Sequence, residues 1–340
     1  MSDAPDDATP DATPEFEHAP VMRDEIVATF AGVPAGVVLD ATLGGAGHSQ
    51  AILDSRADLS ILGIDRDADA LAAATVRLAP YGARAMTFKC RFDQLDQAMA
   101  AHQVTELSGA LFDLGVSSHQ LDVAERGFSY RHEGPLDMRM DAEDAKDASW
   151  SATDVVNGYP EAQLADVIQR YGDERFARRI AAAIVAARPI ESTTGLAAVV
   201  TAAIPAPARR TGGHPAKRTF QAIRIEVNRE LEALPDALDS ALAALTPGGR
   251  LAVLAYHSGE DRIVKERIRL AETGGCECPP ELPCVCGAVQ TVRLVKAPKR
   301  PSAAEQAGNR RAASARFRVA ERIAPTPVAA GRGPSKGRGH

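Results

Sequence analysis

Short apolar runs alternate with helix-like patterns through the first third of the chain. The apolar runs have strand length and end near turn residues, and the segments between them carry apolar residues at helical spacing. The pattern predicts strands at 36–43, 59–65, 83–90 and 109–116, with helices at 49–56, 67–79 and 93–102. Strands that alternate with helices of about a dozen residues indicate βαβ units and a parallel sheet.

The alternation stops in the middle of the chain and resumes near its end. Between 117 and 219 the pattern lacks a buried strand and predicts helices at 161–171, 173–187 and 194–203. A long amphipathic helix is predicted at 221–245, followed by strands at 250–256, 289–295 and 315–320. We therefore expect an α/β fold, with one doubly wound, mostly parallel sheet and an inserted helical domain. The expected units are a disordered acidic N-terminus (1–17), a discontinuous sheet domain (18–136 and 220–323), a helical insertion (137–219) and a flexible basic tail (324–340).

Composition places the chain among ordinary globular proteins. Of its 340 residues, 45% are apolar and 25% are charged. An apolar stretch of about 18 residues would be needed to span a membrane, and each candidate is broken by a charge or a proline. The N-terminus lacks the basic and apolar regions of a signal peptide, so we expect a cytoplasmic protein without a membrane partner.

Charge is unevenly distributed along the chain. The formal net charge is −6, yet residues 288–340 contain 12 Lys/Arg and 2 Glu. An acidic body with separate basic segments favours a polyanionic partner, although a tail that only aids solubility explains the charges equally well.

A glycine-rich loop follows the first predicted strand and precedes a helix. It runs from Asp40 to His48, and its glycines let the backbone pass close to a ligand. Asp65 ends the second predicted strand, where a carboxylate can accept hydrogen bonds from both hydroxyls of a ribose. A dinucleotide-binding loop would need a third glycine where Gln50 stands, which makes a nicotinamide oxidoreductase the weakest alternative. An acid four residues before Gly44 is instead typical of S-adenosylmethionine methyltransferases.

Two further residues stand where predicted strands end. Phe92 follows the third strand and is placed either to stack on an adenine ring or to fill the core. Asp113 ends the fourth strand, where side chains face the ligand crevice of a doubly wound sheet.

Motifs spread over residues 18–320 closely resemble the ribosomal RNA small subunit methyltransferase H family, also called MraW. The matching stretches are 18–22, 24–25, 40–49, 64–67, 113–118, 120–122, 126–129, 134–141 (GPLDMRMD), 171–172, 219–228, 256–258 and 260–262. The resemblance implies a class I, Rossmann-like fold and methyl transfer from S-adenosylmethionine to the exocyclic N4 of a cytidine in the decoding region of 16S rRNA. It implies 16S rRNA within the 30S subunit as the partner, and it leaves the oligomeric state open, with a homodimer as one alternative.

The resemblance also implies which residues bind the cofactor. Together with the glycines of the loop, the implied set is Gly44, Gly45, Ala46, Gly47, His48, Asp65, Phe92, Asp113 and Gln120. The chain departs from the family pattern at Ala46, where the family often has glycine, at His119, where it has proline, and at Gly259, where it has an aliphatic residue.

Methylation of an amine needs a group that accepts a proton or a hydrogen bond from the nitrogen. The candidates are Asp113, Asp137 and His257. Asp113 could be taken up by the cofactor, Asp137 could instead pair with Arg139, and His257 could be a hydrogen-bonded histidine at a strand end. Basic residues of the insertion are expected to hold RNA phosphates: Arg209, Arg210, Lys217 and Arg218.

Four cysteines stand close together near the end of the chain. Cys276, Cys278, Cys284 and Cys286 form two Cys-x-Cys pairs within 11 residues, which could bind one structural zinc ion. A reduced surface loop or a disulfide-prone loop is the alternative.

Two other functions remain open on the sequence. One is an S-adenosylmethionine enzyme that acts on a small molecule or a protein. The other is a non-catalytic RNA-binding factor of ribosome assembly that uses the cofactor only for stability.

Overall fold

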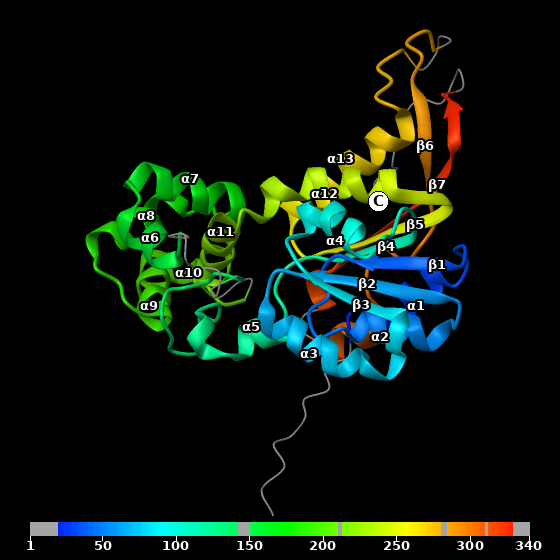
Figure 1. Cartoon of the computed structure of the whole chain (residues 1–340). Helices are drawn as coiled ribbons and strands as arrows, with labels where there is room; N and C mark the ends of the chain where they lie inside the picture. Colours follow the sequence, from blue (N-terminus) through cyan, green and yellow to red (C-terminus); the bar gives the residue numbers. More distant parts are fainter. Residues whose placement is uncertain (1–19, 142–149, 210–212, 280–283, 310–311, 329–340) are drawn as a thin grey trace, which may run out of the picture.

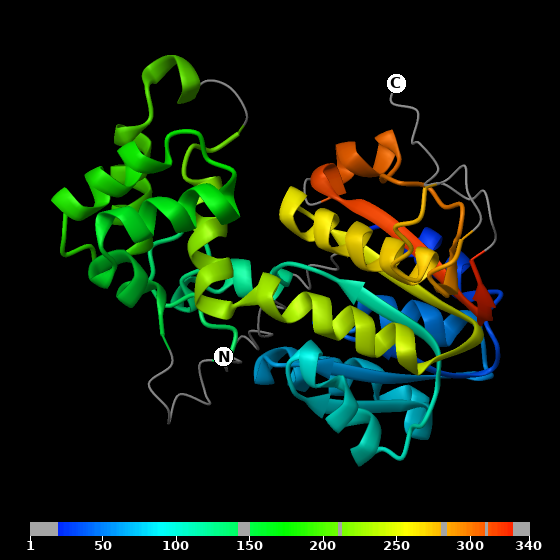
Figure 2. The same cartoon turned by 90° about the horizontal axis from the view of Figure 1, so that it is seen from above.

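A sheet domain and a helical unit lie side by side in the computed structural model (Figures 1 and 2). The structure describes residues 20–141, 150–209, 213–279, 284–309 and 312–328. The expected acidic N-terminus, Arg210 and most of the expected basic tail therefore lie outside the described residues.

The sheet has seven strands in the order β3-β2-β1-β4-β5-β7-β6. The strands are β1 (Gly36–Asp40), β2 (Leu59–Asp65), β3 (Ala85–Lys89), β4 (Leu107–Asp113), β5 (Leu245–Ala255), β6 (Val289–Leu294) and β7 (Arg316–Pro327). Strands β1 to β5 pair in parallel, whereas β7 runs antiparallel to both β5 and β6. This topology confirms the predicted doubly wound, mostly parallel α/β fold.

Helices cover both faces of the sheet. They are α1 (Arg23–Phe30), α2 (Gly47–Ser55), α3 (Ala68–Leu78), α4 (Leu95–Ala101), α12 (Glu230–Ala244) and α13 (Ser258–Thr273), with the short α5 (Ser118–Asp122) and α14 (Ala303–Gly308) nearby. Alternate residues of the central strands face opposite sides. Leu39 and Leu62 pack with α4, α12 and α13, while Val38 and Ile61 pack with α1, α2 and α3. The apolar runs in the sequence thus reflect strands that are buried on both faces.

The helical unit has a core of its own. Its helices are α6 (Ala152–Gly158), α7 (Glu161–Gly172), α8 (Ala177–Ala186), α9 (Thr193–Ala203), α10 (Ala206–Arg209) and α11 (Lys217–Asn228). Their buried apolar residues form one cluster that draws on the chain from Phe128 to Ile223. Three of these helices match the predicted segments 161–171, 173–187 and 194–203 closely.

The prediction of one long helix over 221–245 is wrong. Helix α11 ends at Asn228 and α12 begins at Glu230, because Arg229 between them takes a left-handed conformation with φ 51°. Helical periodicity continues through this residue, so the sequence pattern gives no warning of the break. The conformation is costly for a residue with a Cβ, and contacts on either side must hold it.

Two strands also begin or end elsewhere than expected. Strand β5 begins at Leu245, before the expected Pro-Gly-Gly turn, and its register to β4 shifts at that point. Strand β7 continues to Pro327, into the stretch expected to form the tail. None of the described helices combines the length and the hydropathy that crossing a bilayer requires.

Candidate active site

Three aspartates end the neighbouring strands β1, β2 and β4. They are Asp40, Asp65 and Asp113, and they share the carboxyl edge of the parallel sheet with the glycine-rich loop. This edge, at the point where the strand order reverses between β1 and β4, is where doubly wound folds bind ligands.

Asp65 holds the glycine-rich loop through its side chain. Its Oδ2 accepts a hydrogen bond from the backbone N–H of Gly44 at 2.8 Å, and its Oδ1 accepts one from Asp67 N–H at 2.9 Å. Burial raises the pKa of Asp65 to about 6, although these two hydrogen bonds act to lower it. Each carboxylate oxygen has two lone pairs, so Asp65 keeps an acceptor position on each oxygen. A half-buried carboxylate with one free acceptor position on each oxygen fits the two hydroxyls of a ribose.

Packing against the protein, and not only room for a ligand, explains the residues of the glycine-rich loop. Ala46 is fully buried and adopts φ 60°, a left-handed conformation in which a glycine would be unstrained. A Cβ on Gly47 would lie 2.6 Å from Cγ of Pro20, so the first residue of α2 leaves room for that proline. A Cβ on Gly45 would meet only Arg77, at 3.9 Å, which leaves that side of the loop open for a ligand.

Asp40 is the acid that precedes the glycines, and it points into the protein. Its carboxylate is 1% exposed and accepts hydrogen bonds from Ser49 Oγ at 2.6 Å and from Thr42 N–H at 3.3 Å. Burial raises its pKa. Asp40 therefore ties the end of β1 to the start of α2, and positions the loop from behind.

Asp113 joins two other side chains at the end of β4. Its Oδ1 accepts a hydrogen bond from the hydroxyl of Tyr256 at 2.7 Å, and its Oδ2 lies 3.5 Å from Nδ1 of His48. The other ring nitrogen of His48 lies 2.9 Å from the carbonyl oxygen of Val21. A carbonyl oxygen only accepts hydrogen bonds, so Nε2 of His48 carries a proton. A hydrogen bond between Nδ1 and Asp113 then requires a second proton, either on Nδ1 or on the carboxylate.

Burial raises the pKa of Asp113, and the hydrogen bond from Tyr256 and the nearness of His48 only partly offset it. The Asp113 side chain is still 27% exposed. It is thus a proton-seeking carboxylate that a ligand at the sheet edge can reach. The sequence reading missed Tyr256 as a partner, although its place directly after β5 could have indicated it.

Phe92 and Gln120 are the other two residues predicted to contact the cofactor. Phe92 is half-buried, with its ring 6.3 Å from that of Phe112 in an edge-to-face arrangement. Gln120 is buried: its amide donates to Asp67 at 2.8 Å and its Oε1 accepts from Ser117 N–H at 3.1 Å. Both positions are compatible with the predicted cofactor contacts.

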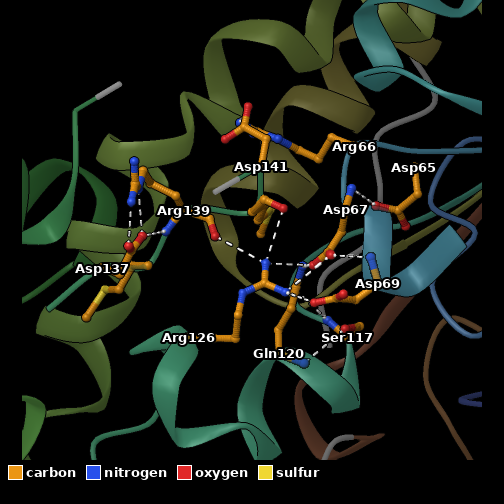
Figure 3. Close-up of polar contacts among 12 residues, drawn as sticks. Asp65, Arg66, Asp67, Asp69, Ser117, Gln120, Arg126, Asp137, Arg139 and Asp141 are labelled. Carbon is orange, nitrogen blue, oxygen red and sulfur yellow. Dashed lines mark hydrogen bonds and ion pairs between the residues drawn. The ribbon is translucent and has the colours of Figure 1, made fainter. Parts of the chain in front are cut away.

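A network of arginines and aspartates joins the sheet domain to the helical unit (Figure 3). Arg126 donates to both carboxylate oxygens of Asp67, at 3.2 and 2.8 Å, and to Asp69 at 3.1 Å. The same guanidinium also donates to the carbonyl oxygens of Arg139 and Met140. Burial would raise the pKa of Asp67, but hydrogen bonds and charge from Arg126 hold it below its usual value.

Asn228 at the end of α11 and Arg66 after β2 both hold the loop that contains residues 138–141. The buried amide of Asn228 accepts from Met140 N–H at 3.0 Å and donates to the carbonyl of Met138 at 2.7 Å. Arg66 donates to the carbonyl of Asn228 and to the carboxylate of Asp141, at 3.1 and 2.6 Å. The sequence reading quoted these residues as motif members without a role. Partners 75 to 162 residues apart cannot be paired from local patterns.

The other two candidate proton acceptors are engaged in local contacts. The carboxylate of Asp137 accepts from Nε and Nη2 of Arg139 at 2.8 and 2.7 Å. Burial would raise its pKa, but Arg139 holds it below its usual value. His257 caps α13, where its ring Nδ1 accepts from Glu260 N–H at 3.4 Å and its Nε2 lies 3.0 Å from the Glu260 carboxylate.

The predicted RNA-binding residues lie on the surface of the helical unit. Arg209 and Arg218 are exposed, and both donate hydrogen bonds to backbone carbonyls. The hydrogen bond from Arg218 to the carbonyl oxygen of Asp173 is 2.6 Å long. Lys217 is exposed at the start of α11. The sequence analysis did not predict a second group of arginines on this unit. They line an open cavity of about 400 Å³ between α7 and α8, whose lining residues are Gln169, Arg175, Phe176, Ala177, Arg178 and Arg179.

The four clustered cysteines converge in space. The sulfur atoms of Cys276, Cys278, Cys284 and Cys286 all lie within 4.8 Å of one another. Cys90 stands apart, buried at the end of β3.

Comparison with known proteins identifies the family. The model of the MraW methylase family matches residues 15–323, which is most of the chain. The chain belongs to the MraW methylase family. Among its relatives in that family is the ribosomal RNA small subunit methyltransferase H of Heliobacterium modesticaldum, 48% identical over 91% of this chain and 99% of that protein. The protein of the same name from Mycobacterium sp. strain KMS is 46% identical over 93% of this chain and 87% of that protein.

Membership of the MraW family establishes the chain as a methyltransferase that uses S-adenosylmethionine. The carboxyl edge of the sheet fits that cofactor, since Asp65 keeps acceptor positions for a ribose and the loop is open at Gly45. The roles of individual residues there stay predictions.

Proposed function

We propose that this MraW-family methyltransferase transfers a methyl group to the exocyclic N4 of a cytidine in the decoding region of 16S rRNA, within the 30S subunit. The names of the relatives support small-subunit ribosomal RNA as the substrate class. The choice of an amine as the acceptor of the methyl group rests on one observation: the carboxylate of Asp113 at the sheet edge is partly exposed and has a raised pKa.

The geometry of that edge supports the predicted set of cofactor-holding residues. Asp65 would accept hydrogen bonds from the ribose hydroxyls, the loop from Gly44 to His48 would hold the amino-acid moiety, and Phe92 would contact the adenine. Asp113 and Gln120 complete the set. When bound, the cofactor supplies a methyl group activated by its attachment to a sulfonium.

The amine of cytosine is a weak nucleophile, because its lone pair is delocalised into the ring. A carboxylate that accepts a hydrogen bond from N4–H favours a pyramidal nitrogen, whose lone pair is less delocalised into the ring and can point toward the methyl group. As the N4–C bond forms and the C–S bond breaks, the nitrogen must lose one proton. Asp113 takes that proton, and the burial that raises its pKa favours this step.

Asp113 is chosen over the other two candidates because of its partners. Asp137 already accepts two hydrogen bonds from Arg139, which lower its proton affinity. His257 is held by Glu260 at the start of α13. Tyr256 orients Asp113 without neutralising it, since burial and the charge of Asp113 raise the pKa of Tyr256 and keep its phenol a donor.

The RNA substrate is held by the helical unit in this proposal. Arg209, Lys217 and Arg218, with the arginines that line the cavity between α7 and α8, present positive charge on the surface of that unit. Such contacts position the phosphate backbone and weaken as salt increases. The target base must be unpaired or extruded, since N4 is engaged within a duplex.

The deciding experiment supplies the full chain with S-adenosylmethionine labelled on its methyl group. The substrates are naked 16S rRNA and 30S subunits, both from cells that lack the enzyme, and the labelled nucleotide is mapped by mass spectrometry. We expect label on N4 of one cytidine in the 30S subunit, and none with Asp113→Asn. Label on another atom or in the large subunit would overturn the proposal.

Two controls separate the alternatives. Activity on a small molecule or a protein that persists at high salt would favour a different substrate class. An Asp65→Ala variant that loses cofactor binding but still complements a deletion strain would favour a non-catalytic assembly factor.

A further inference from the structure

The segment that joins α13 to β6 carries two Cys-x-Cys pairs. Cys276 and Cys278 follow the end of α13, and Cys284 and Cys286 precede β6. The four sulfur atoms lie within 4.8 Å of one another, with 3.5 Å between Cys276 and Cys284 and 3.4 Å between Cys284 and Cys286. Among the described residues, this is the group of cysteines, histidines and acids that comes together as a metal cage would.

The separations match coordination better than covalent pairing. Four sulfurs at about 2.3 Å from a zinc ion in a tetrahedron lie about 3.8 Å from one another. A disulfide would bring two of them to about 2.05 Å. All five cysteines of the chain are free thiols in the structure. The cluster thus has the dimensions of a tetrathiolate site.

Glycines at the ends of the segment bring the two pairs together. Gly274 and Gly275 end α13 with φ 58° and 72°, and Gly287 turns the chain before β6 with φ 71°. A Cβ on Gly274 would lie 2.4 Å from the carbonyl oxygen of Val289, so the end of α13 packs directly on the first residue of β6. The turns therefore form a fixed base from which both pairs project.

The described residues of the segment bury little apolar surface. Val285 is 88% exposed, Cys286 is exposed and the other three cysteines are only half-buried. In small domains that bury little apolar surface, a disulfide or a metal ion often fixes the shape instead, and the same reasoning applies to this segment. The thiols themselves are the groups placed to provide it.

We propose that Cys276, Cys278, Cys284 and Cys286 bind one zinc ion, which clamps the end of α13 to the start of β6. Four thiolate ligands fill a tetrahedral zinc and leave no position for water or substrate, so the site is structural. Soft thiolates select zinc or iron over magnesium or calcium. In Figure 1 the segment lies at the outer end of β6 and β7, on the side of the sheet domain away from the helical unit.

The clamp supports the outer edge of the sheet. Helix α13 packs along β6, with Thr291 Oγ1 donating to the carbonyl of Ala271 at 3.3 Å. The zinc ion closes this pair at one end and leaves the carboxyl edge near Asp113 untouched. The proposal therefore stands whether or not the RNA substrate is the one proposed above.

The test begins with the full chain purified in reducing, oxygen-free buffer without chelator. Elemental analysis by mass spectrometry is expected to find one zinc per chain. Replacing the metal with Co²⁺ is expected to give the thiolate-to-cobalt charge-transfer bands and the strong visible bands of a tetrahedral site. This measurement needs no variant, so it does not depend on a variant that folds.

Variants then assign the ligands. Cys276→Ser with Cys284→Ser is expected to lose the zinc and to melt at a lower temperature, while its affinity for S-adenosylhomocysteine stays within about twofold, because the cofactor edge lies elsewhere. Cys90→Ser is the matched control and is expected to keep one zinc per chain.

Three results would overturn the proposal. One is a well-folded chain with four titratable thiols that takes up neither zinc nor cobalt. Another is one iron per chain in place of zinc. The third is zinc retained by the double variant, which would place the ion elsewhere.

Discussion

The aspartates at the carboxyl edge of the sheet differ sharply from those at the junction with the helical unit. Asp40, Asp65 and Asp113 are surrounded by hydroxyls, backbone N–H groups and one histidine, and burial raises the pKa of each. At the junction, Asp67 and Asp137 lie against arginines, and the pKa of both is lowered. Both regions are rich in acidic motif residues, yet their electrostatics are opposite.

The difference separates binding groups from structural groups. A carboxylate paired with an arginine has its charge neutralised and its lone pairs occupied, so it has little left for a ligand. A carboxylate held only by neutral donors keeps its demand for protons and hydrogen bonds. We infer that the sheet edge is built for the cofactor and the target amine, and that the junction is built to orient the two units.

The largest expected effect tests the junction. Arg126→Met leaves Asp67 buried without its cation, and we expect the free energy of unfolding to fall by about 3–5 kcal/mol. Chemical denaturation followed by circular dichroism measures this loss. The control is Arg170→Met, which removes an exposed pair with Asp166 and should cost at most about 1 kcal/mol. Equal losses in the two variants would remove the distinction.

A pair of matched variants tests which aspartate accepts the proton. Asp113→Asn is expected to lower kcat about 100-fold or more, because it removes the acceptor. Asp137→Asn is expected to change kcat by less than about tenfold and to lower stability by about 1 kcal/mol, through loss of the ion pair with Arg139. Single-turnover methylation of 30S subunits measures both. The opposite ranking would make Asp137 the acceptor.

The pH dependence of cofactor binding tests Asp65. Its pKa of about 6 lies above the usual 3.8, so its protonation on acidification favours the folded chain and removes an acceptor from the ribose. We expect the affinity for S-adenosylhomocysteine to fall as the pH drops through about 6, as measured by titration calorimetry. Asp65→Asn should bind about tenfold to 100-fold more weakly at neutral pH and lack this dependence. A variant that keeps the same dependence would assign it to another group.

The smallest expected effect concerns Tyr256. Its hydrogen bond lowers the pKa of Asp113, so Tyr256→Phe should raise that pKa further. The acidic limb of the pH profile of kcat/KM should then move to higher pH, with a loss of less than about tenfold at the optimum. An unchanged profile would mean that Asp113 does not control that limb.

Local patterns predicted the fold better than the site. Strand β2 has the predicted bounds, and α7 differs from its prediction by one residue, because strongly periodic apolar patterns report burial directly. Strand position also placed Asp65 and Asp113 at the ligand edge. It could not show that the Asp40 side chain turns inward to Ser49, since side-chain direction depends on neighbours.

The junction was beyond prediction for a different reason. Arg126, Asn228 and Arg66 each pair with residues far away in the chain. In the sheet domain, the sequence analysis also did not predict helix α13. Motif resemblance marked several of these residues without showing their partners. Only the folded arrangement separates an aspartate that binds a ligand from one that binds an arginine.

The left-handed conformation of Arg229 has a consequence for how the two units are joined. Helix α11 belongs to the helical core and α12 to the sheet core, and one residue forms the elbow between them. Arg224 and Glu230 brace the elbow with two hydrogen bonds of 2.8 Å. These contacts restrict the angle between the two helices. An RNA held by the helical unit, as proposed above, would therefore meet the methyl donor at a fixed angle, and the two cores should melt in one cooperative step.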